Sequence, residues 1–449
     1  MKILKNQTTV NLKSANKIRK VPAVSVVTWL WLILLITGQT NAQSFSGRFS
    51  TSFYTWERVV SDSSSSNHLR LYQTAQITLG QLASNKLSFH LYGLASQDLA
   101  DSAEDDPIPR LYNAYFRWKD NKGVINQIKL GRQRIASGAG YGIIDGMDLT
   151  LRIGKYAKVA GFVGFLVPFT NTVEVDNWDN SHAFGFRAST NQLLGAKILL
   201  SFQQRNRRPA AYPAPGRYAP QREQNLVFDS LEQRLLALDV YRYFSKKLSI
   251  YGRLDYDLEQ ERVRRGQFEL KILATEKLEL SGEFFHRAPL LEANSIFTVF
   301  EQNTSQHLGL RVNYRLKPAW FLNGNLGYAL YEGDEALRFG VGLRFKYGYI
   351  GYNFRSGYGG ENNGAYASIN YPLNAKLALM VSTGLSRYRL YSETADANTS
   401  LTGSFGFNYK PAKNFTFDFL GQGVRNRFFN SDLRFFVKAN YWIFKKNNR

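Results

Sequence analysis

The chain has 449 residues, enough for two or three soluble domains, a formal net charge of +22 at pH 7 and no cysteine. The missing cysteine excludes disulfide bonds, thiolate metal sites, cysteine nucleophiles and a lipid-modified N-terminal cysteine. No run of about 18 or more apolar residues follows the N-terminal region, which excludes a helical membrane protein.

The first 42 residues have the three parts of a secretory signal peptide. A basic segment at 17–20 precedes the apolar stretch 26–36, and Thr40, Asn41 and Ala42 form a small-x-small cleavage site before Gln43. An uncleaved anchor helix is the alternative, but this stretch is too short to cross about 30 Å of hydrocarbon. We therefore expect a cleaved signal at 1–42 and one domain at 43–449.

The predicted mature chain keeps a basic excess. Six of the 57 basic residues and none of the 35 acidic residues lie within 1–42, which leaves an excess of 16. Such an excess suits nucleic acid, an acidic membrane surface or an anionic solute. For an exported chain we expect the last two and no nucleic acid.

From Ser44 onward the apolar residues recur every second position. In 337–347 the odd positions are Leu, Phe, Val, Leu, Phe and Tyr, and the even positions are glycine or basic. The segment 307–316 alternates in the same way, and so do 112–119, 248–258, 267–273 and 401–409. Side chains of a β-strand point alternately to its two faces, so each segment is predicted to be a strand with one apolar face.

Short and long connections alternate between these strands, as in outer-membrane barrels with tight periplasmic turns and long outer loops. Ten short turns and eleven outward connections predict 22 antiparallel strands, within a range of 18–22. The longer connections are expected at 61–67, 97–109, 136–146, 167–181, 206–230, 287–305, 357–363 and 391–398. The aromatic-rich segment 433–444 resembles the terminal strand of such barrels, although five residues follow it. The fold class is therefore all-β, a transmembrane antiparallel β-barrel.

One segment carries a family resemblance. Gly131, Arg132 and Gln133, followed by Gly138, Gly140 and then Asp145 and Gly146, resemble a motif of alginate-export-type outer-membrane porins. The similarity spans roughly 110–165. It implies a strand end, a glycine-rich outer loop and a strand start, in a monomeric barrel of eighteen strands that conducts acidic polysaccharide or other anions. The direct count of 22 differs from that number.

Residues of the polar parity should point into the lumen. The basic ones are Arg117, Lys119, Lys129, Arg253, Lys271, Arg311, Arg315, Arg338, Arg344, Lys346, Arg355, Arg434 and Lys438, and the acidic ones are Asp239, Asp255, Asp257, Glu269, Glu279, Glu283 and Asp418. We expect the acidic cluster to be neutralised by Arg253 and Lys271. The stretch 307–356 has no inward acid and predicts a basic wall of Arg311, Arg315, Arg338, Arg344, Lys346 and Arg355, which favours anions. The alternative is that these residues pair with acidic loops such as 101–106 or with lipopolysaccharide phosphates.

Nothing in the sequence marks an enzyme, a metal site or a cofactor. The five histidines show no nucleophile–histidine–carboxylate pattern at a fixed spacing, although such triads are spatial and need no motif. Asp255 and Asp257 share one face, and salt bridges to Arg253 and Lys271 explain them better than a metal does.

The sequence thus predicts a passive porin in the outer membrane of a Gram-negative bacterium. Its expected partners are outer-membrane lipid, lipopolysaccharide and anionic small-molecule or saccharide solutes, and a monomer is favoured. One of the connections 206–230 and 287–305 is expected to fold into the lumen. The competing hypotheses are a non-conducting surface barrel that acts as an enzyme, adhesin or scaffold through its long loops, and a receptor-transporter, for which the N-terminal plug is missing.

Overall fold

The computed structural model describes residues 44–446 apart from 62–63, 83–84, 102–105, 137, 176, 194, 208–212, 215–223, 226–230, 290–302 and 390–395. The predicted signal peptide 1–42 lies outside the described residues. So do most of the two connections expected to fold inward.

The strands, in chain order, are β1 (Ser44–Ser61), β2 (Ser64–Leu82), β3 (Leu87–Asp98), β4 (Ile108–Lys119), β5 (Ile125–Ala136), β6 (Tyr141–Ile153), β7 (Ala157–Leu166), β8 (Ser181–Leu193), β9 (Ala196–Arg207), β10 (Pro213–Ala214), β11 (Gln224–Asn225) and β12 (Gln233–Ser245). They continue as β13 (Leu248–Asp257), β14 (Arg262–Leu273), β15 (Leu278–Arg287), β16 (Ser305–Lys317), β17 (Trp320–Tyr331), β18 (Asp334–Phe345), β19 (Gly348–Gly357), β20 (Glu361–Pro372), β21 (Leu377–Arg389), β22 (Asn398–Ala412), β23 (Phe415–Arg425) and β24 (Asp432–Lys446).

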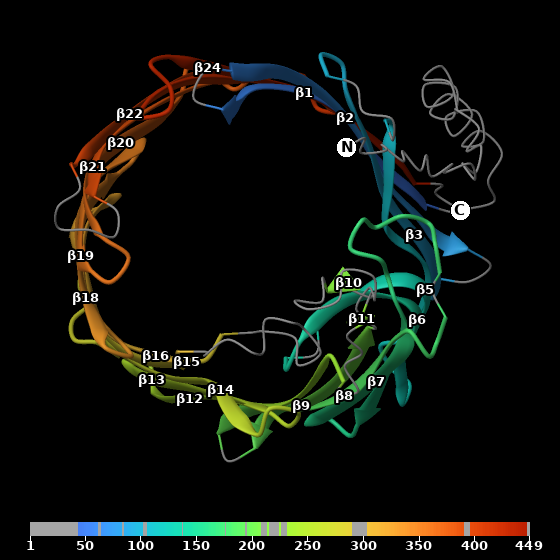
Figure 1. The fold of residues 1–449 in the computed structure, drawn as a ribbon. Helices are drawn as coiled ribbons and strands as arrows, with labels where there is room; N and C mark the ends of the chain where they lie inside the picture. Colours follow the sequence, from blue (N-terminus) through green and yellow to red (C-terminus); the bar gives the residue numbers. More distant parts are fainter. Residues whose placement is uncertain are drawn as a thin grey trace, which may run out of the picture. The chain divides into compact units, whose positions relative to one another are not determined.

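Twenty-two of these strands form one closed antiparallel sheet. Each strand pairs with the next along the chain, except that β9 pairs directly with β12 and leaves β10 and β11 as a separate two-stranded sheet. The ring closes where β1 pairs with β24, from Ser44 opposite Lys446 to Tyr54 opposite Phe436 (Figure 1). Closure pairs the first strand with the last, so that the sheet has no free edge strand, which is why barrels can cross a membrane. The predicted fold class and the count of 22 strands are confirmed.

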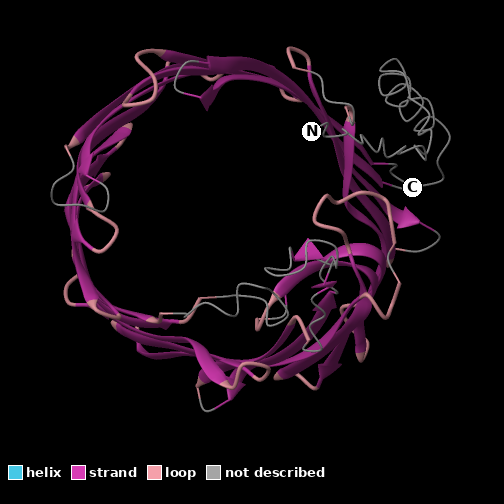
Figure 2. Cartoon of the chain, in the orientation of Figure 1, coloured by secondary structure: helices cyan, strands magenta, loops and turns pink. Residues whose placement is uncertain are grey.

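The outward face of the sheet is apolar and exposed. On β16, for example, Leu310 is 61% exposed, while Leu326 on β17 and Phe339 on β18 stand beside it on the same face. A continuous exposed apolar band of this kind is stable only in contact with lipid. The chain is therefore a transmembrane β-barrel of the bacterial outer-membrane type. Among the described residues, which contain only strands, turns and loops (Figure 2), there is no helix long and apolar enough to span a membrane.

Three of the expected connections differ from the structure. Residues 64–67 belong to β2, because the β1–β2 hairpin extends past its neighbours and, out of the membrane, needs no apolar face. The stretch 361–363 begins β20. The connection expected at 136–146 shrinks to 137–140, because β6 already begins at Tyr141.

The third difference, the shortened connection between β5 and β6, accompanies a bend in the barrel wall. β4 pairs with β5 only from Ala114 to Lys119, so β5 leaves its neighbour at its outer half. The strands around β5 to β9 curl inward from the ring (Figure 1). Buried apolar side chains fill this curl, in one cluster of Ile135, Ile144, Phe162, Leu166 and Ala183 and another of Ala139, Leu235 and Ala237. The inward element that the structure describes is thus the β5–β6 hairpin.

Candidate functional site

The residues of the glycine–arginine–glutamine motif meet where β5 leaves β4. The Arg132 guanidinium, 4% exposed, donates hydrogen bonds to both carboxylate oxygens of Asp145, at 2.8 and 2.7 Å. It also donates to the carbonyl oxygens of Leu111, at 3.2 Å, and Thr172, at 2.5 Å. At this point β5 no longer pairs with β4. Arg132 therefore supplies hydrogen-bond donors to a backbone carbonyl of β4 and to one of the β7–β8 connection.

The neighbouring motif residues bring the backbones together. Gln133 is fully buried, and its Nε2 donates to the carbonyl oxygen of Gly146, at 3.2 Å. A Cβ on Gly146 would lie 2.1 Å from the carbonyl oxygen of Val163, so only glycine fits. Asp145 and Gly146 lie inside β6 and not at a strand start, because the strand begins further out in the inward hairpin. The motif Gly131, Arg132, Gln133, Asp145 and Gly146 is brought together as a structural joint.

The tip of this hairpin, whose described residues are 136 and 138–140, is held by arginines of the facing wall. Arg187 on β8 donates to the carbonyl oxygen of Ala136, at 2.6 Å. Arg253 on β13 donates to that of Gly138, at 2.5 Å, and Arg264 on β14 to that of Ala139, at 3.5 Å. Ala139 N–H donates in turn to Ser201 Oγ on β9, at 2.8 Å. These contacts hold the tip on the inner face.

Two of these arginines escaped the sequence interpretation. Arg187 has inward parity on β8, so the alternation could have found it. Arg264 could not be found in this way, because a bulge in the β13–β14 pairing places Arg265 opposite Asp255 and Val263 opposite Tyr256 and skips it. Parity arguments fail at a bulge.

The acidic cluster is neutralised at several points, as expected. The buried Asp255 carboxylate bridges Arg253, at 2.8 Å, and Arg264, at 2.9 Å. Arg253 also reaches Asp239, at 3.4 Å, and Lys271 pairs with Glu279, at 2.7 Å. Within the described part of the chain, no cluster of three or more acidic or histidine side chains is arranged to hold a metal ion.

The predicted basic wall occupies β16, β18 and β19. Its inward face is traced by register: Arg311 lies opposite Asn325, and Arg338 lies opposite Gly327 and Arg355. Arg315 and Arg344 belong to the same face, since both lie opposite Phe321. Five of the six residues thus share one surface, which we name the basic wall.

Lys346 is the exception among the six. It lies in the turn between β18 and β19, one residue beyond the end of the strand, with its Nζ 4.8 Å from the Tyr347 ring centroid. The hydrogen bond with Tyr347 raises the pKa of Lys346 above its ordinary value. In the alternation of β18, Lys346 would point to the same face as the basic wall, but the strand ends before this residue.

The basic wall makes neutral contacts. Arg344 stacks 4.4 Å from the centre of the Phe321 ring, and Arg338 donates to Tyr331 Oη, at 3.5 Å. Arg315 and Arg355 donate to the carbonyl oxygens of Glu276 and Tyr358. Across the residues that the structure describes, no carboxylate lies within 4.0 Å of the wall arginines. Asp106, from the acidic connection proposed as their partner, accepts instead from the backbone of Asp98.

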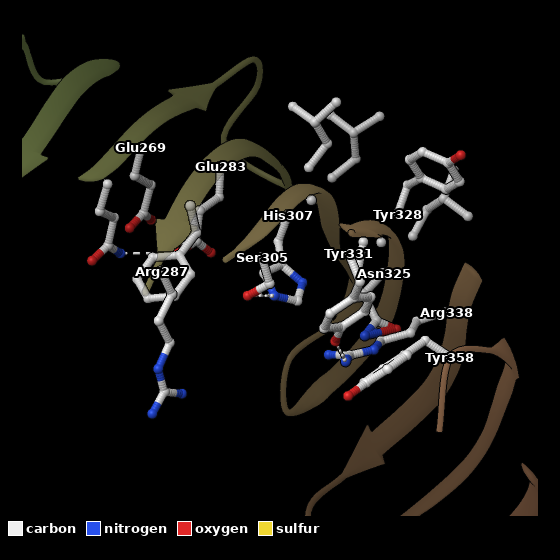
Figure 3. A pocket seen from close by; sticks show the side chains of 18 of the residues that line it. Glu269, Glu283, Arg287, Ser305, His307, Asn325, Tyr328, Tyr331, Arg338 and Tyr358 are labelled. Atoms are coloured by element: carbon white, nitrogen blue, oxygen red, sulfur yellow. Dashed lines mark hydrogen bonds between the residues drawn. The ribbon is translucent and has the colours of Figure 1, made fainter. Parts of the chain in front are cut away.

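A recess of about 770 Å³ opens on the inner face beside this wall. Glu269 and Glu283, which are register partners, lie at one end of it, and Arg338 with Tyr331 and Tyr358 lies at the other (Figure 3). His307 stands between the two ends. Arg265, Arg287, Arg311 and Glu332 also line it, so the recess presents charges of both signs along its length.

No protein-family model matches the chain, and no curated protein matches it. Among solved structures, OpdQ of Pseudomonas aeruginosa is 11% identical and the match covers 89% of this chain and 97% of that chain, with a TM-score of 0.41. A BenF-like porin from Pseudomonas fluorescens Pf-5 is 9% identical, with 90% and 98% covered and a TM-score of 0.42. The P pilus usher (PapC) translocation pore is 8% identical, with 88% and 99% covered and a TM-score of 0.48. At identities this low, the similarity concerns the fold alone. The resemblance to alginate-export-type porins is not confirmed.

Proposed function

We propose that the chain is a passive channel of the outer membrane that favours anionic solutes, including saccharide acids. The observation that carries the proposal is the pair Arg338 and Arg355, which lie directly opposite each other on neighbouring strands without a carboxylate partner among the described residues. Like charges in this position destabilise a sheet. A passing anion would offset that repulsion, as basic rings in selective pores do.

The arginines of the hairpin tip have a different role in this proposal. Arg187 pairs with the Asp148 carboxylate, and Arg253 and Arg264 pair with the Asp255 carboxylate. A solute would have to displace those partners. The path for anions therefore follows the basic wall on β16 to β19, whose arginines have no carboxylate partner among the residues that the structure describes.

The test is the single-channel current of the refolded mature chain in a planar bilayer, with a salt gradient that gives the selectivity. We expect an anion-selective reversal potential. In the variant Arg338→Glu with Arg344→Glu, the anion-to-cation permeability ratio should fall about threefold or more, because four units of charge change on the path.

The matched control is Lys346→Glu with Lys376→Glu, which makes the same change of charge in two short turns. Its permeability ratio should stay closer to that of the unchanged chain. A folded barrel without conductance would contradict the channel. Equal effects of the two double variants would contradict the basic wall as the path.

A further inference from the structure

A serine, a histidine and an aspartate form a connected chain on the inner face of β2 and β3, away from the basic wall. Ser66 and His68 are two residues apart on β2 and so share a face. Ser66 Oγ lies 3.0 Å from His68 Nε2, and His68 Nδ1 lies 2.8 Å from Asp98 Oδ2. The three groups lie near the ends of β2 and β3 that carry the β1–β2 and β3–β4 connections.

Asp98 is held firmly in this chain. Its carboxylate accepts hydrogen bonds from the backbone N–H groups of Leu69, Ala100 and Asp101, at 3.2, 3.1 and 3.2 Å. Its side chain is 3% exposed. A carboxylate accepts only, so the Nδ1 of His68 is the donor and carries the proton. The Nε2 lone pair then faces Ser66, whose hydroxyl donates to it.

The ring of His68 is also fixed from the side. Trp56 on β1 stacks on it, with centroids 4.7 Å apart and an interplanar angle of 12°. His68 is 9% exposed. Stacking and the Asp98 hydrogen bond together set the plane and tautomer of the imidazole, which is the arrangement a general base for a serine hydroxyl requires.

Two other serine–histidine contacts allow a comparison with the Ser66–His68 contact. Ser88 Oγ lies 3.0 Å from His90 Nε2, and Ser305 Oγ lies 3.3 Å from His307 Nε2. Residues i and i+2 of a strand meet easily, so the contact alone indicates nothing. In the described part of the chain, only His68 among these three histidines also hydrogen bonds to a carboxylate.

We propose that Ser66, His68 and Asp98 are a catalytic triad that hydrolyses carboxylic esters at this mouth of the barrel, in addition to conduction. Ser66 Oγ would attack the ester carbonyl carbon while His68 Nε2 takes the hydroxyl proton. The C–O bond to the alcohol then breaks, and the alcohol leaves with that proton. Water attacks the acyl-serine in the same way, releasing the carboxylic acid and restoring Ser66.

The test is covalent labelling of the refolded, detergent-solubilised barrel with a fluorophosphonate probe, followed by intact mass and peptide mapping. We expect one adduct, on Ser66, and turnover of p-nitrophenyl acetate. Ser66→Ala should abolish both, and Asp98→Asn should slow labelling by roughly 100-fold or more, because the imidazole loses its orienting partner.

Ser88→Ala is the matched control, because it removes an equivalent serine–histidine contact that lacks the carboxylate. It should label and hydrolyse like the unchanged chain. Heat-dependent gel mobility and bilayer conductance establish that each variant is folded, independently of ester hydrolysis. A folded barrel without a Ser66 adduct, or with equal ester turnover in Ser66→Ala, would overturn the triad and leave the channel unaffected.

Discussion

Gly131 is the residue at which the barrel wall turns inward. Its φ is +117°, a conformation that residues with a side chain rarely adopt. A Cβ at this position would lie 2.4 Å from the carbonyl oxygen of Ala114, on the strand that β5 is leaving. Both the conformation and the close approach of the two backbones therefore require glycine.

Gly131→Ala should lower the free energy of unfolding by about 2 kcal/mol, because it adds backbone strain and a steric clash. The measurement is urea unfolding of the refolded barrel, followed by tryptophan fluorescence. Gly324→Ala is the control, since Gly324 lies in β17, a Cβ added there would contact nothing within 4 Å, and its φ is not positive. If the two variants unfold at the same urea concentration, Gly131 is not a strained bend.

For single residues, the sequence predicts the position of a structurally important motif better than it predicts the contacts that the motif makes. The motif around Gly131 and Arg132 is recognisable, but its role in joining β4, β6 and the β7–β8 connection depends on a bend that alternation does not encode. The Ser66–His68 contact could not be predicted, because Ser66 lies in the segment 61–67, which was expected to be a loop and belongs to β2 from Ser64 onward. Its third member, Asp98, is 30 residues from His68 along the chain, and only the β2–β3 register brings it near.

The β5–β6 hairpin is the element that departs most from a regular barrel. Its inward face carries the apolar residues Ile135 and Ile144, buried in one cluster with Leu166 of β7, whereas the inward face of β16 to β19 is polar. Arginines of β8, β13 and β14 bind the tip from the facing wall. The hairpin is therefore a packed inner element that narrows the lumen.

Accessibility of the tip tests this packing, and the absence of cysteine in the chain makes the experiment clean. Ala139→Cys should react slowly with a polar thiol reagent, because Ala139 is buried against β12. Adding Arg253→Ala should raise the rate about tenfold, since a charge-assisted hydrogen bond of about 1.5 kcal/mol is lost while Arg264 still neutralises Asp255.

Lys271→Ala is the control for that variant, because Lys271 is a basic inner-wall residue that pairs with Glu279 and not with the tip. It should leave the reaction rate of Ala139→Cys unchanged. Fast labelling of Ala139→Cys with both arginines intact would show that the tip does not pack on the wall.

Elements inside the membrane are predictable from sequence, and elements outside it are less so. β16 and β18 alternate without interruption, because lipid lies on one side and the lumen on the other. The extended end of the β1–β2 hairpin is mostly polar, with Val59 and Val60 as exceptions, and β5–β6 has apolar residues on its inward face. Neither environment imposes the alternation from which strand boundaries were inferred, which is why 61–67 and 136–146 were expected to be loops.

The strand number is a property of the whole molecule and follows from its connections. Ten short turns alternate with eleven connections at the opposite end, and this alternation alone gives 22. The eighteen strands that the family resemblance implies are wrong for this chain. The motif at 131–133 and 145–146 determines only the contacts between neighbouring strands, whereas the number of strands depends on every turn of the chain.

Closure of the ring can be tested by a disulfide between its first and last strands. Thr51 on β1 and Ala439 on β24 are register partners, so their Cα atoms should lie between about 4.5 and 5.5 Å apart, within the range for a disulfide. Thr51→Cys with Ala439→Cys should therefore cross-link on oxidation, and the denatured chain should migrate faster in a gel until it is reduced. Thr51→Cys with Lys438→Cys should cross-link poorly, because neighbouring strand residues point to opposite faces. Equal cross-linking of both pairs would contradict this register, and no cross-link in either would contradict closure between β1 and β24.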